Sequence, residues 1–131
     1  MRAALPRART DWAAGGDTDR RQRELLRRYV DAHRAGDHDA LTALLREDLR
    51  VSFPPLPLWV DGRAAYQEES RRFADPGDYR IVAVGANRQP AVAVLLRRPD
   101  HSPFRLHAVE VLRIEADRVA EIVARQMSGS T

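Results

Sequence analysis

A twelve-residue run near the end of the chain alternates between apolar and polar side chains with the period of a β-strand. The run from Phe104 to Glu115 reads F-R-L-H-A-V-E-V-L-R-I-E. Because successive side chains of a strand point to opposite faces, every second residue shares one face. That face carries Phe104, Leu106, Ala108, Glu110, Leu112 and Ile114. The run therefore requires a sheet with one buried face, and it places a carboxylate among five apolar side chains on that face.

This carboxylate, Glu110, is the first candidate for chemistry. A buried ionised carboxylate is costly unless it is paired, and burial raises the pKa of a carboxyl group. A raised pKa suits a hydrogen-bond donor or a general acid/base near neutral pH. Two structural alternatives stay open: a carboxylate paired with an arginine, or one that is exposed at an unfilled part of the sheet.

Helical patterns come before the strands. A capping residue among 17–19, followed by apolar residues at helical spacing, predicts a helix that ends near Ala35, with Gly36 as its C-cap. A second helix begins at Asp37 or Asp39, and a short strand covers 49–53. The remaining elements are a third helix over 63–73 and strands over 79–84, 91–97, 105–116 and 118–126. This order predicts an α+β fold, in which three helices pack on a strongly curved, mainly antiparallel sheet and leave a cone with an apolar interior.

The length of 131 residues predicts one domain. We assign residues 1–18 to a flexible N-terminal arm, 19–127 to the domain and 128–131 to a tail. No apolar run approaches the length of about 18 residues that indicates a membrane helix, and the N-terminus lacks the apolar core of a secretory signal. A cytoplasmic protein is therefore expected, with no contact to membranes.

Charge and motif content exclude several function classes. All 22 basic residues are arginine, but 19 interspersed acids leave a net charge of only +3, so the folded core is not expected to bind nucleic acid. Cysteine is absent, and the four histidines lack metal-ligand spacing, so no metal site is expected. No phosphate-binding or dinucleotide motif is present, which predicts that the protein uses no nucleotide cofactor.

Several segments of these elements resemble a known protein family. The stretch L-L-R-R-Y-V-D-A-H-R-A-G-D-H-D-A-L, with D-G-R further along, resembles the nuclear transport factor 2-like superfamily. That group includes SnoaL-like polyketide cyclases and ketosteroid isomerases. The segments P-P-L-P-L-W-V-D-G-R, A-N-R-Q-P-A and H-A-V-E-V-L are similar to the SnoaL-like C-terminal domain of extracytoplasmic-function sigma factors.

The likeness to ketosteroid isomerases implies roles for individual residues. In that family a tyrosine on the first helix and a protonated acid on a late strand donate hydrogen bonds to an enolate oxygen. Tyr29 matches the tyrosine and Glu110 matches the acid. Phe53 stands where the family has its proton-transfer aspartate, so steroid isomerisation by that mechanism is not expected. His33, at the inward edge of the first helix, is the candidate for the missing base. For Tyr29 and His33 a purely structural role in the core is the alternative.

Substrate-binding residues are expected around the same interior. Trp59 follows three prolines and is interpreted as part of a hydrophobic lid, with a loop packed on the core as the alternative. Inward-facing positions on the third helix and the last strands complete the set. The expected binding residues are Phe53, Trp59, Tyr66, Leu112, Ile122 and Gln126.

We therefore expect a cofactor-independent enzyme of SnoaL-like type. Its chemistry would be an acid/base cyclisation, isomerisation or elimination on a hydrophobic, oxygenated, polyketide-like molecule in natural-product metabolism. A second reading is a non-catalytic ligand-binding or regulatory module derived from a sigma-factor C-terminal domain. A third is a dimerisation domain, because the open sheet of this superfamily often packs against a second copy.

Overall fold

The structure is a computed structural model that describes residues 16–73, 75–86 and 89–127. Helix α2 begins at Gly16, so residues 16–18, which the sequence assigned to the arm, are helical. The rest of the expected arm and the tail at 128–131 lie outside the described residues. The boundary differs because Gly16 is accommodated in the first turn of the helix, where glycine is tolerated better than in the interior.

Three helices and six strands make up the described fold. The helices are α2 (Gly16–Ala35), α3 (His38–Leu44) and α4 (Arg63–Phe73). The strands are β1 (Leu45–Ser52), β2 (Trp59–Asp61), β3 (Asp78–Ala86), β4 (Gln89–Arg97), β5 (Arg105–Glu115) and β6 (Arg118–Gln126). The sheet order is β2-β1-β6-β5-β4-β3, with β1 parallel to β6 and every other pair antiparallel. The predicted α+β arrangement is thereby confirmed, with a sheet that stays open between β2 and β3.

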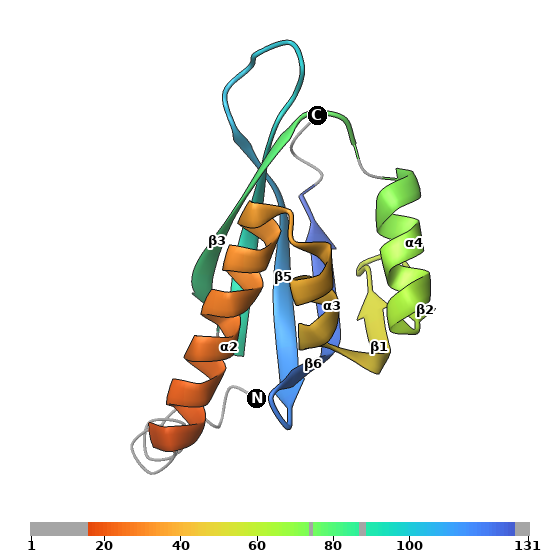
Figure 1. Ribbon diagram of the computed structural model, residues 1–131. Helices are drawn as coiled ribbons and strands as arrows, with labels where there is room; N and C mark the ends of the chain where they lie inside the picture. Colours follow the sequence, from red (N-terminus) through yellow and green to blue (C-terminus); the bar gives the residue numbers. More distant parts are fainter. Residues whose placement is uncertain (1–15, 74, 87–88, 128–131) are drawn as a thin grey trace.

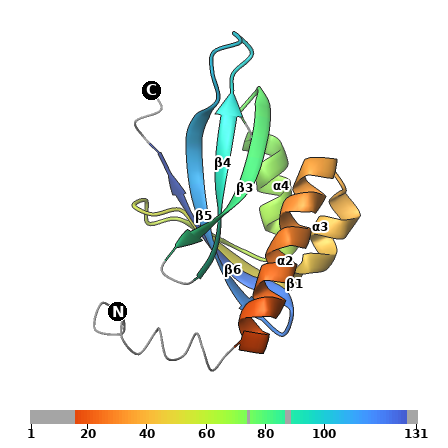
Figure 2. The same cartoon turned by 90° about the vertical axis from the view of Figure 1, so that its left-hand side faces the viewer.

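The three helices lie on one side of the sheet (Figures 1 and 2). Helix α2 packs against β3 and β4, whereas α4 packs against β1 and β2. The two helices therefore cover opposite ends of the sheet, and β5 and β6 lie between them (Figure 1). The buried leucine, valine and isoleucine side chains of the core lie on this side of the sheet and come from α2, α3 and all the longer strands.

Strand β5 follows the alternation that its sequence predicts over most of its length. Ala108 and Leu112 are buried, and Glu110 lies between them on the same face. The face changes near the start of the strand. The pairing shifts between Val94–Ala108 and Leu95–Leu106, so that His107 is an extra residue in β5. Such a bulge interrupts the alternation, and Leu106, predicted to share the buried face, is 38% exposed.

The D-G-R segment anchors α4 to the end of α3. Helix α3 leaves its last carbonyl groups without intrahelical partners. The Arg63 guanidinium donates from Nη1 to the carbonyl oxygens of Leu45 (3.1 Å) and Thr42 (3.4 Å). One turn later, the Gln67 amide donates to the Thr42 hydroxyl at 2.8 Å. Gly62, with φ of 102°, supplies the turn that places Arg63 there.

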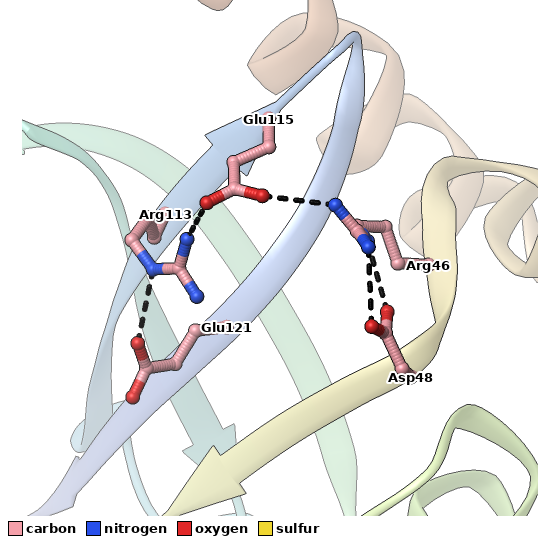
Figure 3. A network of polar contacts seen from close by, with 5 residues as sticks. All are labelled: Arg46, Asp48, Arg113, Glu115 and Glu121. Atoms are coloured by element: carbon pink, nitrogen blue, oxygen red, sulfur yellow. Dashed lines mark hydrogen bonds and ion pairs between the residues drawn. The ribbon is translucent and has the colours of Figure 1, made fainter.

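The opposite face of the sheet carries a chain of ion pairs near the β5–β6 turn (Figure 3). Arg46 bridges Asp48 (2.8 Å) and Glu115 (2.9 Å), and thereby links β1 to β5. Arg113 bridges Glu115 and Glu121. All five side chains keep substantial exposed surface, so solvent screens these pairs and they add little to stability. We assign the network to strand register rather than to chemistry.

Replacing Arg63 with leucine should lower the free energy of unfolding by about 1.5–3 kcal/mol, because a charged donor to two helix-end carbonyls is lost. Urea denaturation followed by circular dichroism measures this. Arg71→Ala is the matched control, since Arg71 on the same helix makes only an exposed pair with Glu68. Equal losses in the two variants would contradict the anchoring role.

Candidate functional site

The centre of the site is a hydrogen bond between α2 and β5. The Tyr29 hydroxyl donates to Glu110 Oε1 at 3.1 Å. Tyr29 is 1% exposed, and its hydroxyl reaches from α2 to β5 in the middle of the sheet. Glu110 lies opposite Val92 of β4 on one side and Ala124 of β6 on the other, and both neighbours are buried. Glu110 itself keeps part of its surface accessible, so its carboxyl group is flanked by apolar side chains without being sealed from solvent, and a phenol is its partner.

Burial shifts the proton affinity of both partners. It raises the pKa of Glu110, and the hydrogen bond from Tyr29 opposes that shift only in part. Burial also raises the pKa of Tyr29 well above its usual value, and the nearby charge of Glu110 adds to this. Tyr29 therefore stays protonated and can donate a hydrogen bond. The pH at which Glu110 gains or loses its proton rises toward neutral. Glu110 has no arginine partner among residues 16–73, 75–86 and 89–127, so the arginine-paired alternative does not describe it.

A second phenol faces this pair from α4. Burial raises the pKa of Tyr66 far above its usual value, and the charge of Glu110 raises it further. A hydrogen bond with Ser70, one helical turn later, acts in the opposite direction. Glu110 therefore acts electrostatically on both tyrosines, so the two hydroxyls and the carboxyl group lie in one part of the interior.

His33 lies one turn after Tyr29 on α2. The two ring centroids are 4.7 Å apart and the rings meet edge to face at 70°. His33 keeps exposed surface, and the protein packed around the rest of its ring lowers its pKa to about 4. His33 is therefore uncharged at neutral pH.

The remaining expected binding residues lie at different depths. Leu112 and Ile122 are opposite each other in the sheet and fully buried, so they form the core beside Glu110. Phe53 is partly buried and packs against the same core. Gln126 pairs with Ala108, which puts it on the helix-facing side at the exposed end of β6. Their roles in binding a substrate stay predictions.

Trp59 does not lie where the lid interpretation expects it. The pairing of β1 with β2 matches Val51 to Val60, so Val60 takes the helix-facing position and Trp59 faces the other way. Trp59 is 53% exposed, and its ring lies 5.3 Å from the Arg50 guanidinium. The short strand β2, which the sequence analysis read as loop, fixes this orientation, and it corrects the expected position of Trp59.

Sequence reasoning missed the contribution of Ser70. It lies four residues after Tyr66, the spacing that brings two side chains together on a helix, and this was the available signal. Within the described parts of the chain, no cluster of three or more histidine, aspartate or glutamate side chains could hold a metal ion. The same parts contain no helix long and apolar enough to cross a membrane.

Comparison with protein families agrees with the fold. The family model of the SnoaL-like domain matches residues 26–122, a range that includes Tyr29, Tyr66 and Glu110. The chain is also 38% identical over 106 residues to the ECF RNA polymerase sigma factor SigG of Mycobacterium tuberculosis. That match covers 77% of this chain but only 28% of the sigma factor, so the chain corresponds to less than a third of its relative.

Solved structures share the architecture at low sequence identity. A candidate ketosteroid isomerase from Kribbella flavida superposes with a TM-score of 0.67 and 24% identity, over 83% of this chain and 79% of that one. A candidate polyketide cyclase from Xanthomonas campestris pv. campestris gives a TM-score of 0.60 and 18% identity, over 85% and 93% of the respective chains. These likenesses establish the fold, and the family match confirms the resemblance that the sequence motifs indicate.

The lowered pKa of His33 predicts a specific loss of stability in acid. Its pKa in the folded state is about 4, below the ordinary value of 6.5, so protonation favours the unfolded chain. The free energy of unfolding should fall as the pH drops from about 6.5 to about 4, and His33→Gln should weaken this dependence. Chemical denaturation across that range measures it, with the exposed histidine variant His38→Gln as control. Identical pH profiles for His33→Gln and the parent protein would contradict the assignment.

Proposed function

The chain belongs to the SnoaL-like domain family, and we propose that it binds a neutral, oxygen-bearing hydrophobic molecule between α2, α4 and the sheet and moves a proton on it with Glu110. The observation that carries this proposal is the hydrogen bond from the Tyr29 hydroxyl to Glu110 in apolar surroundings. Such a pair is costly to bury and adds little to packing, and strongly perturbed groups of this kind are typical of functional sites.

The polar groups of the site favour an uncharged ligand. Tyr29 and Tyr66 are protonated donors, and His33 is neutral at pH 7. None of the described arginines accompanies Glu110, so a bound anion would lose its hydration without gaining a cation. A ketone or phenol oxygen instead matches the hydroxyl donors, and the apolar walls match a ring system such as that of a polyketide-like substrate.

The chemistry supported best is removal of a proton from carbon next to a carbonyl group. Ionised Glu110 would take this proton and become a neutral acid, while a tyrosine hydroxyl donates a hydrogen bond to the enolate oxygen that forms. Return of the proton at another carbon completes an isomerisation. Attack of the enolate carbon on a second carbonyl forms a carbon–carbon bond and an alkoxide, and return of the proton from Glu110 to that oxygen completes a cyclisation. Tyr29 holds Oε1 of Glu110, which leaves Oε2 for the substrate.

This assignment moves the base from His33 to Glu110. A general base works best when its pKa lies near the working pH. Burial brings the pKa of Glu110 up toward that range, whereas it takes the pKa of His33 down to about 4. We assign His33 the supporting role of packing against the Tyr29 ring and holding its hydroxyl toward Glu110.

A second candidate function is ligand sensing without turnover. The identity of 38% to part of a sigma factor supports it, because the relative carries this domain within a much longer chain. The same interior would then bind its ligand as a regulatory signal. The two candidates share the binding site and differ in whether Glu110 exchanges a proton with the ligand.

Neutral aromatic ketones such as 2-tetralone provide the test. Proton NMR in deuterated water follows both binding and exchange of the α-hydrogens. The parent protein should bind the ketone and accelerate exchange, and Glu110→Gln should keep binding but lose at least on the order of a hundredfold in rate. Tyr29→Phe should lower the rate, and the exposed α2 variant Arg28→Gln should leave it unchanged. Binding without exchange by the parent protein would favour sensing, and absence of binding would contradict both functions.

A further inference from the structure

A groove separate from the Tyr29–Glu110 site runs along one flank of α2. It has a volume of about 590 Å³ and lies between α2 and the edge formed by β3 and β4. On α2 it extends from Gln22 to Arg34, which at about 1.5 Å per residue is a length of about 18 Å. Neither Tyr29, Tyr66 nor Glu110 lines it.

The floor of the groove is aliphatic. It is formed by Leu26 and Val30 of α2 and by the segment Ala83–Gly85 of β3, with Pro90 of β4 at its end. A glycine inside a strand weakens the strand and often marks a place that another group approaches closely. Gly85 shares the α2-facing side with Ile81, and a Cβ added to it would meet no atom within 4 Å. The strand thus leaves open space above its apolar surface.

The rim of the groove is basic, and its arginines Arg27 and Arg34 differ in whether a carboxylate pairs with them. Arg27 is already paired with Glu24 (2.5 Å) and with the rim residue Asp31 (3.2 Å). Arg34 donates from Nε to the carbonyl oxygen of Ile81 at 3.3 Å, which holds its guanidinium against the edge strand. Among the described residues no carboxylate pairs with Arg34, so its two terminal nitrogens are available to an anion.

From this combination we propose that the groove binds a single-chain amphipathic carboxylate, such as a medium-chain fatty acid. The carboxylate accepts hydrogen bonds from the terminal nitrogens of Arg34, in the paired geometry that guanidinium groups favour. The alkyl chain lies along Leu26, Val30 and the open surface at Gly85. The charge of Arg34 favours an acid over a neutral lipid. The aliphatic floor favours a ligand with an alkyl chain over a small inorganic anion.

Decanoate is the probe, titrated into the full chain and followed by amide chemical shifts in ¹⁵N NMR spectra. Shifts should map to Val30, Arg34 and Val84 rather than to Tyr66 and Glu110. Arg34→Gln should weaken binding about tenfold or more, because one charge-assisted contact is lost. Decanol has the same alkyl chain without the charge. Its affinity for the parent protein should be no higher than the affinity of decanoate for the Arg34→Gln variant.

Two further variants test the floor of the groove. Gly85→Leu should abolish binding by filling the open space, and Ala83→Glu should abolish it by placing a like charge beside the chain. Arg28→Gln, on α2 but outside the groove, is the control and should bind as the parent does. Absence of decanoate binding, equal affinities for Arg34→Gln and Arg28→Gln, or shifts confined to the Tyr29–Glu110 site would each overturn the proposal.

Discussion

The hydrogen bond from Tyr29 to Glu110 connects the 20-residue helix α2 to the middle of the sheet. Tyr29 belongs to the same core as Leu112 and Ile122, so its ring is fixed by packing and only its hydroxyl has a chemical task. Replacing Glu110 with an apolar residue would satisfy the alternation of β5 better than the carboxylate does. At this pair the fold places polar groups where apolar side chains would pack better, and the proposed function rests on this observation.

Other parts of the structure keep this pair in position. Arg63 and Gln67 tie α4 to the end of α3, and this attachment fixes the helix that carries Tyr66. The ion pairs on the other face of the sheet join β1 to the β5–β6 hairpin. The helices α2 and α4 thus each contribute a phenol whose pKa the charge of Glu110 raises.

The alternation of β5 was sufficient to predict the face of Glu110, and the helical spacing of α2 was sufficient to place Tyr29 inward. Local patterns could not predict the bulge at His107, which turns Leu106 toward solvent, because bulges depend on how two strands pair. They also could not fix Trp59, whose face is decided by the register of β2 against β1. The pKa values of Glu110 and His33 depend on burial by distant segments. For this reason the structure was needed to transfer the proposed base from His33 to Glu110.

The pKa of Glu110 itself tests the central claim most directly. Carbon-detected NMR of the side-chain carboxyl group across a pH titration measures it in the parent protein and in Tyr29→Phe. The account predicts a value above the ordinary 4.5 in the parent protein, because burial outweighs the hydrogen bond. It predicts a still higher value in Tyr29→Phe, because the hydrogen bond that favours the ionised form is gone. A parent value at or below 4.5, or a lower value in Tyr29→Phe, would contradict the account.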